Sequence, residues 1–197
     1  MNVSTQILPR EFYDRPTLTV ARELLGAVLV RLQDGVRISG IITETEAYVG
    51  ESDLACHAKA GKTPRPEIMY GPPGSAYVYF NYGIHWMLNA VTEREGFPAA
   101  VLIRATQPLE GIEIIAFRRG KQPRAKWTDG PGKLAQAFGI DKSFNGVDLC
   151  RRESGLWIEM GERISDENVT IGARVGLNSV PEPWKSVPWR FFVKNRE

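Results

Sequence analysis

The stretch ISGIITETEAY, at residues 38–48, decides the architecture that we expect for this chain. β-branched residues are frequent in it, and they favour an extended strand with a half-buried face. Because alternate side chains of a strand share a face, Glu44, Glu46 and Tyr48 are expected to lie side by side. The strand therefore predicts a sheet that carries carboxylates and an aromatic ring on one face.

Turn residues on both sides of this strand predict hairpins. Gln33-Asp34-Gly35 separates the strand from the apolar run AVLVRL, residues 27–32. Farther along, Asn81-Tyr82-Gly83 joins two more strand-like runs. The second turn places Tyr82 near an exposed tip, which is an unusual position for a large ring.

The remaining segments predict helices and short strands around these hairpins. Proline favours a helix start and glycine a helix end. Helices are therefore expected from Asp14-Pro16 to Gly26, from Pro108 to Gly120 and from Gly130 to Gly139, and late strands in LWIEM, NVTIGARVGL and PWRFFVK. Consecutive antiparallel pairs favour an α+β fold. We predict a single domain, residues 1–197, with a mostly antiparallel curved sheet, flanking helices and a protruding β-hairpin.

Composition is that of an ordinary globular chain. Hydrophobic residues make up 43% and charged residues 24% of 197 residues. No apolar run approaches the roughly 20 residues that span a bilayer, and the amino-terminal residues lack the apolar core of a signal peptide. We therefore expect a cytoplasmic protein without a membrane segment.

Net charge is only +2, but basic residues gather in two places. Five lie between Arg118 and Lys126 without an acidic residue, and Lys59, Lys62 and Arg65 form a second group. Such groups can bind phosphates, although each taken alone is better explained as a solvated loop. Glycines before Lys133 could likewise approach an anion at a helix start, or form a simple turn.

Motif spacing excludes several kinds of site. The soft and imidazole donors are Cys56, His57, His85 and Cys150, and their spacing fits no zinc site. The nucleophile elbow G-x-S-x-G and the dinucleotide fingerprint G-x-G-x-x-G are missing too. We therefore expect no metal and no cofactor.

The remaining chemical groups are carboxylates, an arginine and several aromatic rings. A carboxylate such as Glu46 can stabilise an oxocarbenium-like transition state and deprotonate an attacking water. Glu44 and Glu46 could instead be the acid–base pair of a sugar hydrolase, or Glu46 could be a solvent-facing strand charge. Arg104, in the expected strand VLIRA at residues 101–105, could converge on the same place.

The aromatic residues favour a flat ligand. Tyr48, His57 and Tyr79 are candidates for a slot that stacks on such a ligand. An enzyme that acts on a base in duplex DNA must rotate that nucleotide out and fill the gap with a wedge, for which Tyr82 is the candidate. Each of these residues could instead be a packing residue of a strand, a helix surface or a hairpin.

Several strings of the chain closely resemble the alkyladenine (3-methyladenine) DNA glycosylase family. They run in family order over nearly the whole chain: TETEAY (43–48), DLACH (53–57), PGSAYVYFNYG (73–83), LN (88–89), VLIRA (101–105), QPLEG (107–111), DGPGKL (129–134), ARVG (173–176) and PWRFFV (188–193). By this resemblance Glu46 matches the general base that activates water. Arg104 matches the arginine that helps to hold that water, and Val175 matches a backbone carbonyl that contacts it.

The resemblance also implies roles for the aromatic residues. Tyr48, His57 and Tyr79 match the residues that stack around the flipped base, and the backbone near His57 also reads its edge. Tyr82 matches the residue inserted into the duplex. The remaining matches are Asn89, which disfavours the exocyclic amine of normal guanine, and Lys133, a DNA-backbone contact.

As in the family, the resemblance implies a monomeric, metal-free, monofunctional enzyme that acts on double-stranded DNA containing damaged purines. The expected lesions are alkylated purines, hypoxanthine and ethenoadenine, and the product is an abasic site in base excision repair. Asn81 departs from the apolar residue expected before the wedge. The competing hypotheses are a non-catalytic nucleic-acid module with the same slot, and the sugar hydrolase.

Overall fold

The computed structural model describes residues 5–194, and within them eight strands form one antiparallel sheet. The strands are β1 (Val28–Gln33), β2 (Val36–Val49), β3 (Ala76–Asn81), β4 (His85–Val91), β5 (Ala99–Glu110), β6 (Leu156–Glu159), β7 (Val169–Gly172) and β8 (Arg190–Val193). The α-helices are α1 (Arg10–Tyr13), α2 (Thr17–Glu23), α3 (Ile112–Arg119) and α4 (Pro131–Phe138). The α+β class is therefore confirmed.

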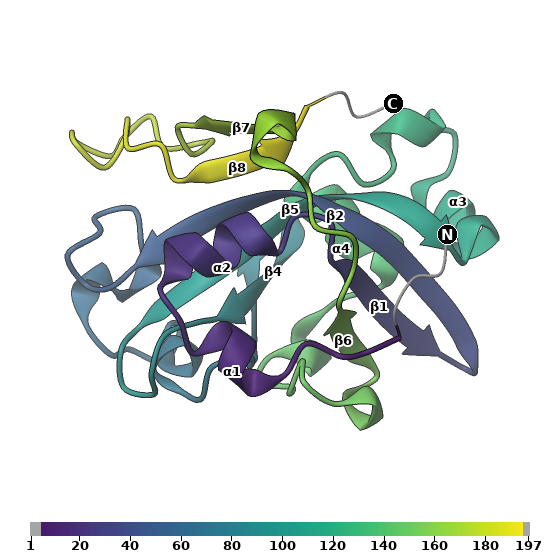
Figure 1. The fold of residues 1–197 in the computed structure, drawn as a ribbon, viewed down its shortest axis with the longest axis horizontal. Helices are drawn as coiled ribbons and strands as arrows, with labels where there is room; N and C mark the ends of the chain where they lie inside the picture. The colour runs from purple at the N-terminus through teal and green to yellow at the C-terminus, as the bar shows by residue number, and fades with distance from the viewer. Residues whose placement is uncertain (1–4, 195–197) are drawn as a thin grey trace.

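Strand β2 is the centre of the sheet (Figure 1). Six strands follow the order β3-β4-β5-β2-β1-β6, and the β7–β8 hairpin joins β2 through β8. The first half of β2 thus pairs with β1 and its second half with β8, while β5 covers the other edge. The expected strand at residues 38–48 is part of β2, so it is held by neighbours on both edges.

Both predicted hairpins are present. Asp34 and Gly35 have positive φ angles of 50° and 77° between β1 and β2. Tyr82 and Gly83, with φ of 49° and 67°, turn the chain between β3 and β4. A positive φ is uncommon for a residue with a side chain, so Tyr82 is held in the left-handed region by the demands of the turn.

The helix that was expected from Asp14-Pro16 is α2. Its apolar side, Val20 and Ala21, is buried. The Thr45 hydroxyl on β2 donates a hydrogen bond of 2.7 Å to the backbone oxygen of Ala21. Thr45 therefore faces the helix, and the opposite face of β2, which carries Glu46, is left for the site.

Among the described residues no helix is both long and apolar enough to cross a membrane.

Two expectations about element boundaries are wrong. Pro108 does not start a helix, because β5 continues through it to Glu110 and α3 begins after Gly111. The pairing of β2 with β5 shifts register beside Pro108, and such an irregularity tolerates a residue without an N–H. The strand expected in NVTIGARVGL ends at Gly172, because Arg174 turns inward to a buried partner.

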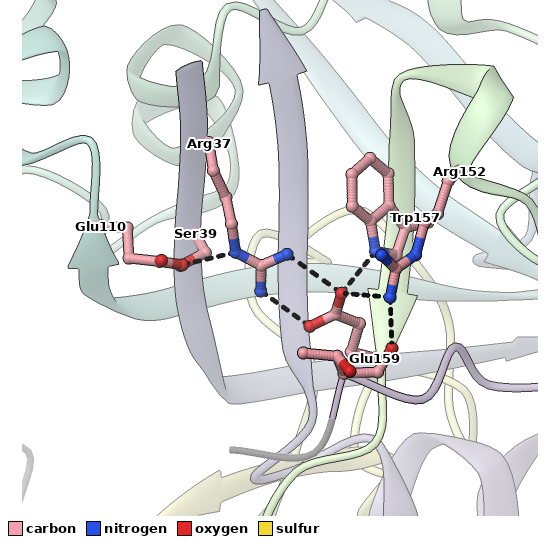
Figure 2. A network of polar contacts seen from close by, with 7 residues as sticks. Arg37, Ser39, Glu110, Arg152, Trp157 and Glu159 are labelled. Carbon is pink, nitrogen blue, oxygen red and sulfur yellow. Dashed lines mark hydrogen bonds and ion pairs between the residues drawn. The ribbon is translucent and has the colours of Figure 1, made fainter. Parts of the chain in front are cut away.

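A polar network connects the edge strand β6 to β2 and β5 (Figure 2). The Glu159 carboxylate is fully buried and accepts hydrogen bonds from two Arg37 nitrogens, at 3.0 and 2.7 Å. The indole nitrogen of Trp157 donates to it at 2.8 Å. Arg37 also binds Glu110 on β5, so the network spans three strands without reaching the cavity described next.

Candidate active site

A cavity of about 190 Å³ opens on the Glu46 side of β2. Strands β2, β3, β4 and β5 contribute to its wall, together with the segments around His57 and Val175. Seven of the residues predicted for the site line it: Tyr48, His57, Tyr79, Tyr82, Asn89, Arg104 and Val175. Residues that are far apart in the sequence therefore surround one space, and their roles stay predictions.

Glu46 lies beneath this cavity and is 0% exposed, which excludes a solvent-facing strand charge. Its carboxylate accepts the Val175 backbone N–H at 2.7 Å and the Tyr48 hydroxyl at 2.9 Å, and Arg104 Nη1 lies 3.2 Å away. Burial raises the pKa of Glu46 above its ordinary value, although these three partners each oppose the rise. A carboxylate with a raised pKa is a stronger base.

The guanidinium of Arg104 joins both carboxylates of the TETEAY string. Its Nε lies 2.9 Å from Glu44 Oε1, while its Nη1 faces Glu46. A glycosidase of the two-carboxylate type needs one protonated acid and one free base. Here one guanidinium contacts both carboxylates, so the two glutamates do not form a separate acid and a separate base. This arrangement argues against the sugar hydrolase.

Three aromatic rings form one wall of the cavity. The rings of His57 and Tyr79 lie 4.5 Å apart at 75°, and those of Tyr77 and Tyr79 lie 5.2 Å apart. Nδ1 of His57 is 2.8 Å from the Tyr77 hydroxyl. Burial, with smaller contributions from Arg65 and Lys59, lowers the pKa of His57 to about 4. The imidazole is therefore neutral at pH 7.

A buried ion pair holds the loop that carries Val175. Arg174 Nη1 and Nη2 donate to the two Asp53 oxygens at 2.5 and 2.9 Å, and both side chains are 0% exposed. The Arg174 guanidinium also lies 4.7 Å from the centre of the Tyr48 ring. Asp53 in turn accepts the backbone N–H of Val49 and Ala55. The pair thereby ties the β2 end, the segment before His57 and the Val175 loop together.

Tyr82 stands at the mouth of the cavity and is 87% exposed. So large an exposure excludes the alternative that Tyr82 is a packing residue of the hairpin. Ile84, at the same tip, is also exposed. The tip thus presents two apolar side chains to solvent beside the cavity, which suits a surface that contacts a large partner.

Comparison with known proteins shows the family to which the chain belongs. The family model described as methylpurine-DNA glycosylase matches residues 11–197. The chain belongs to this family. As a methylpurine-DNA glycosylase family member it is an enzyme, a hydrolase of N-glycosyl bonds.

Relatives in this glycosylase family match almost the full length of the chain. A protein of Methanocella arvoryzae named "Putative 3-methyladenine DNA glycosylase" is 47% identical over 190 residues, which are 96% of this chain and 93% of that protein. Proteins of the same name from Carboxydothermus hydrogenoformans and Desulfitobacterium hafniense are both 46% identical. They cover 97% and 96% of this chain, and 97% and 96% of their own lengths are matched.

Asn89 and Lys133, the last two predicted residues to be described, differ in their relation to the cavity. Asn89 is buried in the cavity wall, where its amide nitrogen donates to the Tyr77 backbone oxygen at 2.9 Å. That bond fixes the direction of the amide. Lys133 does not line the cavity; it lies on α4 and its ammonium is 2.8 Å from Asp129. Pro131, at the start of the same helix, does line the cavity.

Sequence reasoning missed several residues that shape the site. Tyr77 orients His57, and Asp53 with Arg174 supports Glu46 through Val175. The DLACH and ARVG strings contain Asp53 and Arg174, but no local pattern shows that two residues 121 positions apart pair. In the described part of the chain no group of three or more His, Cys, Asp or Glu residues could hold a metal ion.

Proposed function

We propose that the protein is a monofunctional DNA glycosylase that removes damaged purines from duplex DNA in base excision repair. It flips the damaged nucleotide into the cavity, hydrolyses the N-glycosidic bond and leaves an abasic site. The protein would act as a cytoplasmic monomer with a single domain, residues 1–197, and without a cofactor. The observation that carries this proposal is a fully buried glutamate, Glu46, beneath a cavity lined by aromatic rings.

In this mechanism Glu46 takes a proton from the water that attacks the sugar carbon. Its burial supports this role, because a carboxylate with a raised pKa accepts a proton more readily. Arg104 would orient the water with Glu46, and the Val175 backbone carbonyl would accept a hydrogen bond from the O–H that the water keeps. The Val175 N–H already binds Glu46, which places residue 175 next to the base.

Recognition of the base would depend on stacking. Tyr48, His57 and Tyr79 all line the cavity, and aromatic rings suit a flat purine. The neutral imidazole of His57 adds no repulsion to a cationic, alkylated purine. Asn89 would exclude the exocyclic amine of normal guanine, because its amide is already held by a backbone bond.

Access to the base would require a wedge and contacts to the DNA backbone. Tyr82, exposed at the hairpin tip, would fill the gap that the flipped nucleotide leaves. Lys133 and the basic segments would contact phosphates. Alkylated purines stack weakly and leave as neutral bases, so they flip and depart easily. Neutral hypoxanthine and ethenoadenine would in addition need a proton donor.

A direct test is incubation with duplexes that each carry one hypoxanthine, 3-methyladenine, 7-methylguanine or ethenoadenine. Abasic sites are scored by alkaline cleavage of the labelled strand, with an undamaged duplex of the same sequence as control. The proposal predicts abasic sites in at least one lesion duplex and none above background in the control. Tight binding without release in any duplex would favour the non-catalytic nucleic-acid module.

A further inference from the structure

The carboxylate of Glu44 has no role in the mechanism above, yet it is almost as buried as Glu46. Arg104 lies between the two, with its Nε 2.9 Å from Glu44 Oε1 and its Nη1 3.2 Å from Glu46 Oε2. The exposed fractions of the side chains are 12% for Arg104, 7% for Glu44 and 0% for Glu46. All three charges therefore interact where water screens them poorly.

The backbone creates this arrangement through paired irregularities in the sheet. The register of β2 and β5 shifts on both sides of Glu44, so that Glu44 lies opposite Ala105 and Thr45 opposite Ile103. Arg104 consequently has no directly paired residue on β2 and stands at the gap between Glu44 and Thr45. A bulge changes the direction of a side chain, and here it brings the guanidinium between two carboxylates that alternate along one strand.

A second cation holds Glu44 from the other side. Arg190, on β8, places its Nη1 3.2 Å from the same Glu44 oxygen that binds Arg104. Arg190 is paired across the strands with Glu46, so β8 brings its guanidinium close to the base without a direct ion pair. Glu44 is thus fixed by a donor from β5 and a donor from β8.

We propose that Glu44 is a positioning residue for base removal: it holds Arg104 through Nε, so that Nη1 faces the Glu46 carboxylate and the attacking water. This inference rests on the proposed role of Glu46 as the general base. An arginine has several rotatable bonds, and a group fixed at one end by a charged hydrogen bond loses little freedom when it binds at the other.

Glu44 also affects the pKa of Glu46. Arg104 lowers the pKa of Glu46, while the negative charge of Glu44 raises it. The two effects oppose each other, so Arg104 can orient the water without making Glu46 a weak base. The charged and titratable groups that interact with Glu46 are Arg104 from β5, Glu44 and Tyr48 from β2, and Tyr79 from β3. Two more arginines contact these neighbours: Arg190 from β8 binds Glu44, and Arg174 from the Val175 loop lies over Tyr48.

The test compares Glu44→Gln and Arg190→Gln with the wild type in single-turnover release of hypoxanthine from duplex DNA as a function of pH. Glutamine can still accept the Arg104 Nε–H but has no charge. The pKa of Glu46 should therefore fall in Glu44→Gln, and the acid limb of the profile should move to lower pH, with a plateau rate lower by roughly three- to tenfold. Affinity for the lesion duplex should stay the same.

Arg190→Gln should move the acid limb the opposite way, to higher pH, because Glu44 then keeps Arg104 but loses the positive charge of Arg190. A purely structural disturbance has no reason to shift the two profiles in opposite directions. The matched control is Glu110→Gln. Glu110 is also bound by an arginine, but it lies on β5 outside the cavity, so the profile should coincide with the wild type.

Two results separate the possible failures. If Glu44→Gln keeps the wild-type rate and acid limb while Glu46→Gln is inactive, the proposed role of Glu44 is overturned and that of Glu46 is not. Full activity of Glu46→Gln would overturn the proposed mechanism and this inference with it. If Glu44→Gln does not fold, as judged by circular dichroism, the Arg190→Gln profile decides: an unshifted limb overturns the inference.

Discussion

Replacing Arg174 by methionine tests whether the buried ion pair holds the site together. The substitution keeps an apolar stem of similar length and removes four hydrogen bonds. Two of these go to Asp53, at 2.5 and 2.9 Å, and the others go to the backbone oxygens of Ala47 and Trp184 at 3.0 and 3.1 Å. Asp53 would keep only its bonds from two backbone N–H groups and would remain buried as an unpaired charge.

The expected cost follows from that unpaired charge. Breaking a fully buried ion pair by removing one partner costs about 3–5 kcal/mol. Most domains have a stability of about 5–15 kcal/mol, so the variant should still fold at 25 °C. With a typical urea dependence, the midpoint of unfolding should fall by roughly 2 M. Release of a damaged base should also slow, because Val175 is adjacent to Arg174 and binds Glu46.

Equilibrium urea unfolding, followed by tryptophan fluorescence and circular dichroism, measures the change. Arg15→Met is the control, because Arg15 pairs with Glu23 at 2.8 Å where the two side chains are 33% and 40% exposed. That variant should lose less than about 1 kcal/mol. If Arg174→Met loses no more than Arg15→Met, the ion pair does not support the site as we describe.

Three further predictions concern the hairpin, the slot and the far end of the sheet. Tyr82→Ser should slow base release from a fully paired duplex more than from a mismatched one in single-turnover assays; equal slowing would make the wedge role untenable. Because burial lowers the pKa of His57 to about 4, its ring should stay neutral above pH 5 in an NMR titration assigned with His57→Gln, and a transition near pH 6.5 would contradict this environment. Burial alone raises the pKa of Glu159, but bonds from Arg37 and Trp157 lower it overall from the ordinary 4.5. The network's stabilisation is thus complete above that pH and is lost as pH falls below it, so the urea midpoint of Glu159→Gln should change less between pH 6 and pH 3 than that of the wild type; parallel pH curves would refute this.

Local patterns were sufficient for much of the sheet. The turn residues at Asp34-Gly35 and Tyr82-Gly83 adopt the positive φ angles that such hairpins require, so both hairpins could be predicted from a few residues. The helix boundary at Pro108 could not be, because proline is acceptable in a strand wherever the register shifts. A shift of register depends on the partner strand, which the local sequence does not specify.

The candidate site likewise has a part that local sequence predicted and a part that it could not predict. Alternation along β2 correctly placed Glu44 and Glu46 on one face, and Arg104 bonds to both. The partners that hold them could not be read from spacing. Arg190 and Arg174 come from segments more than 100 residues away, and only the folded sheet brings them to β2. Sequence therefore indicated which groups could react, and tertiary structure determines how each is charged and oriented.

The most direct measurement of the central claim is single-turnover release of hypoxanthine by Glu46→Gln, with binding to the same duplex measured by fluorescence anisotropy. The glutamine side chain has almost the same shape but cannot accept a proton from water. The account predicts that release slows by about 10²- to 10⁴-fold while the dissociation constant changes little. Release within a few-fold of the wild-type rate would contradict the role of Glu46 as the base.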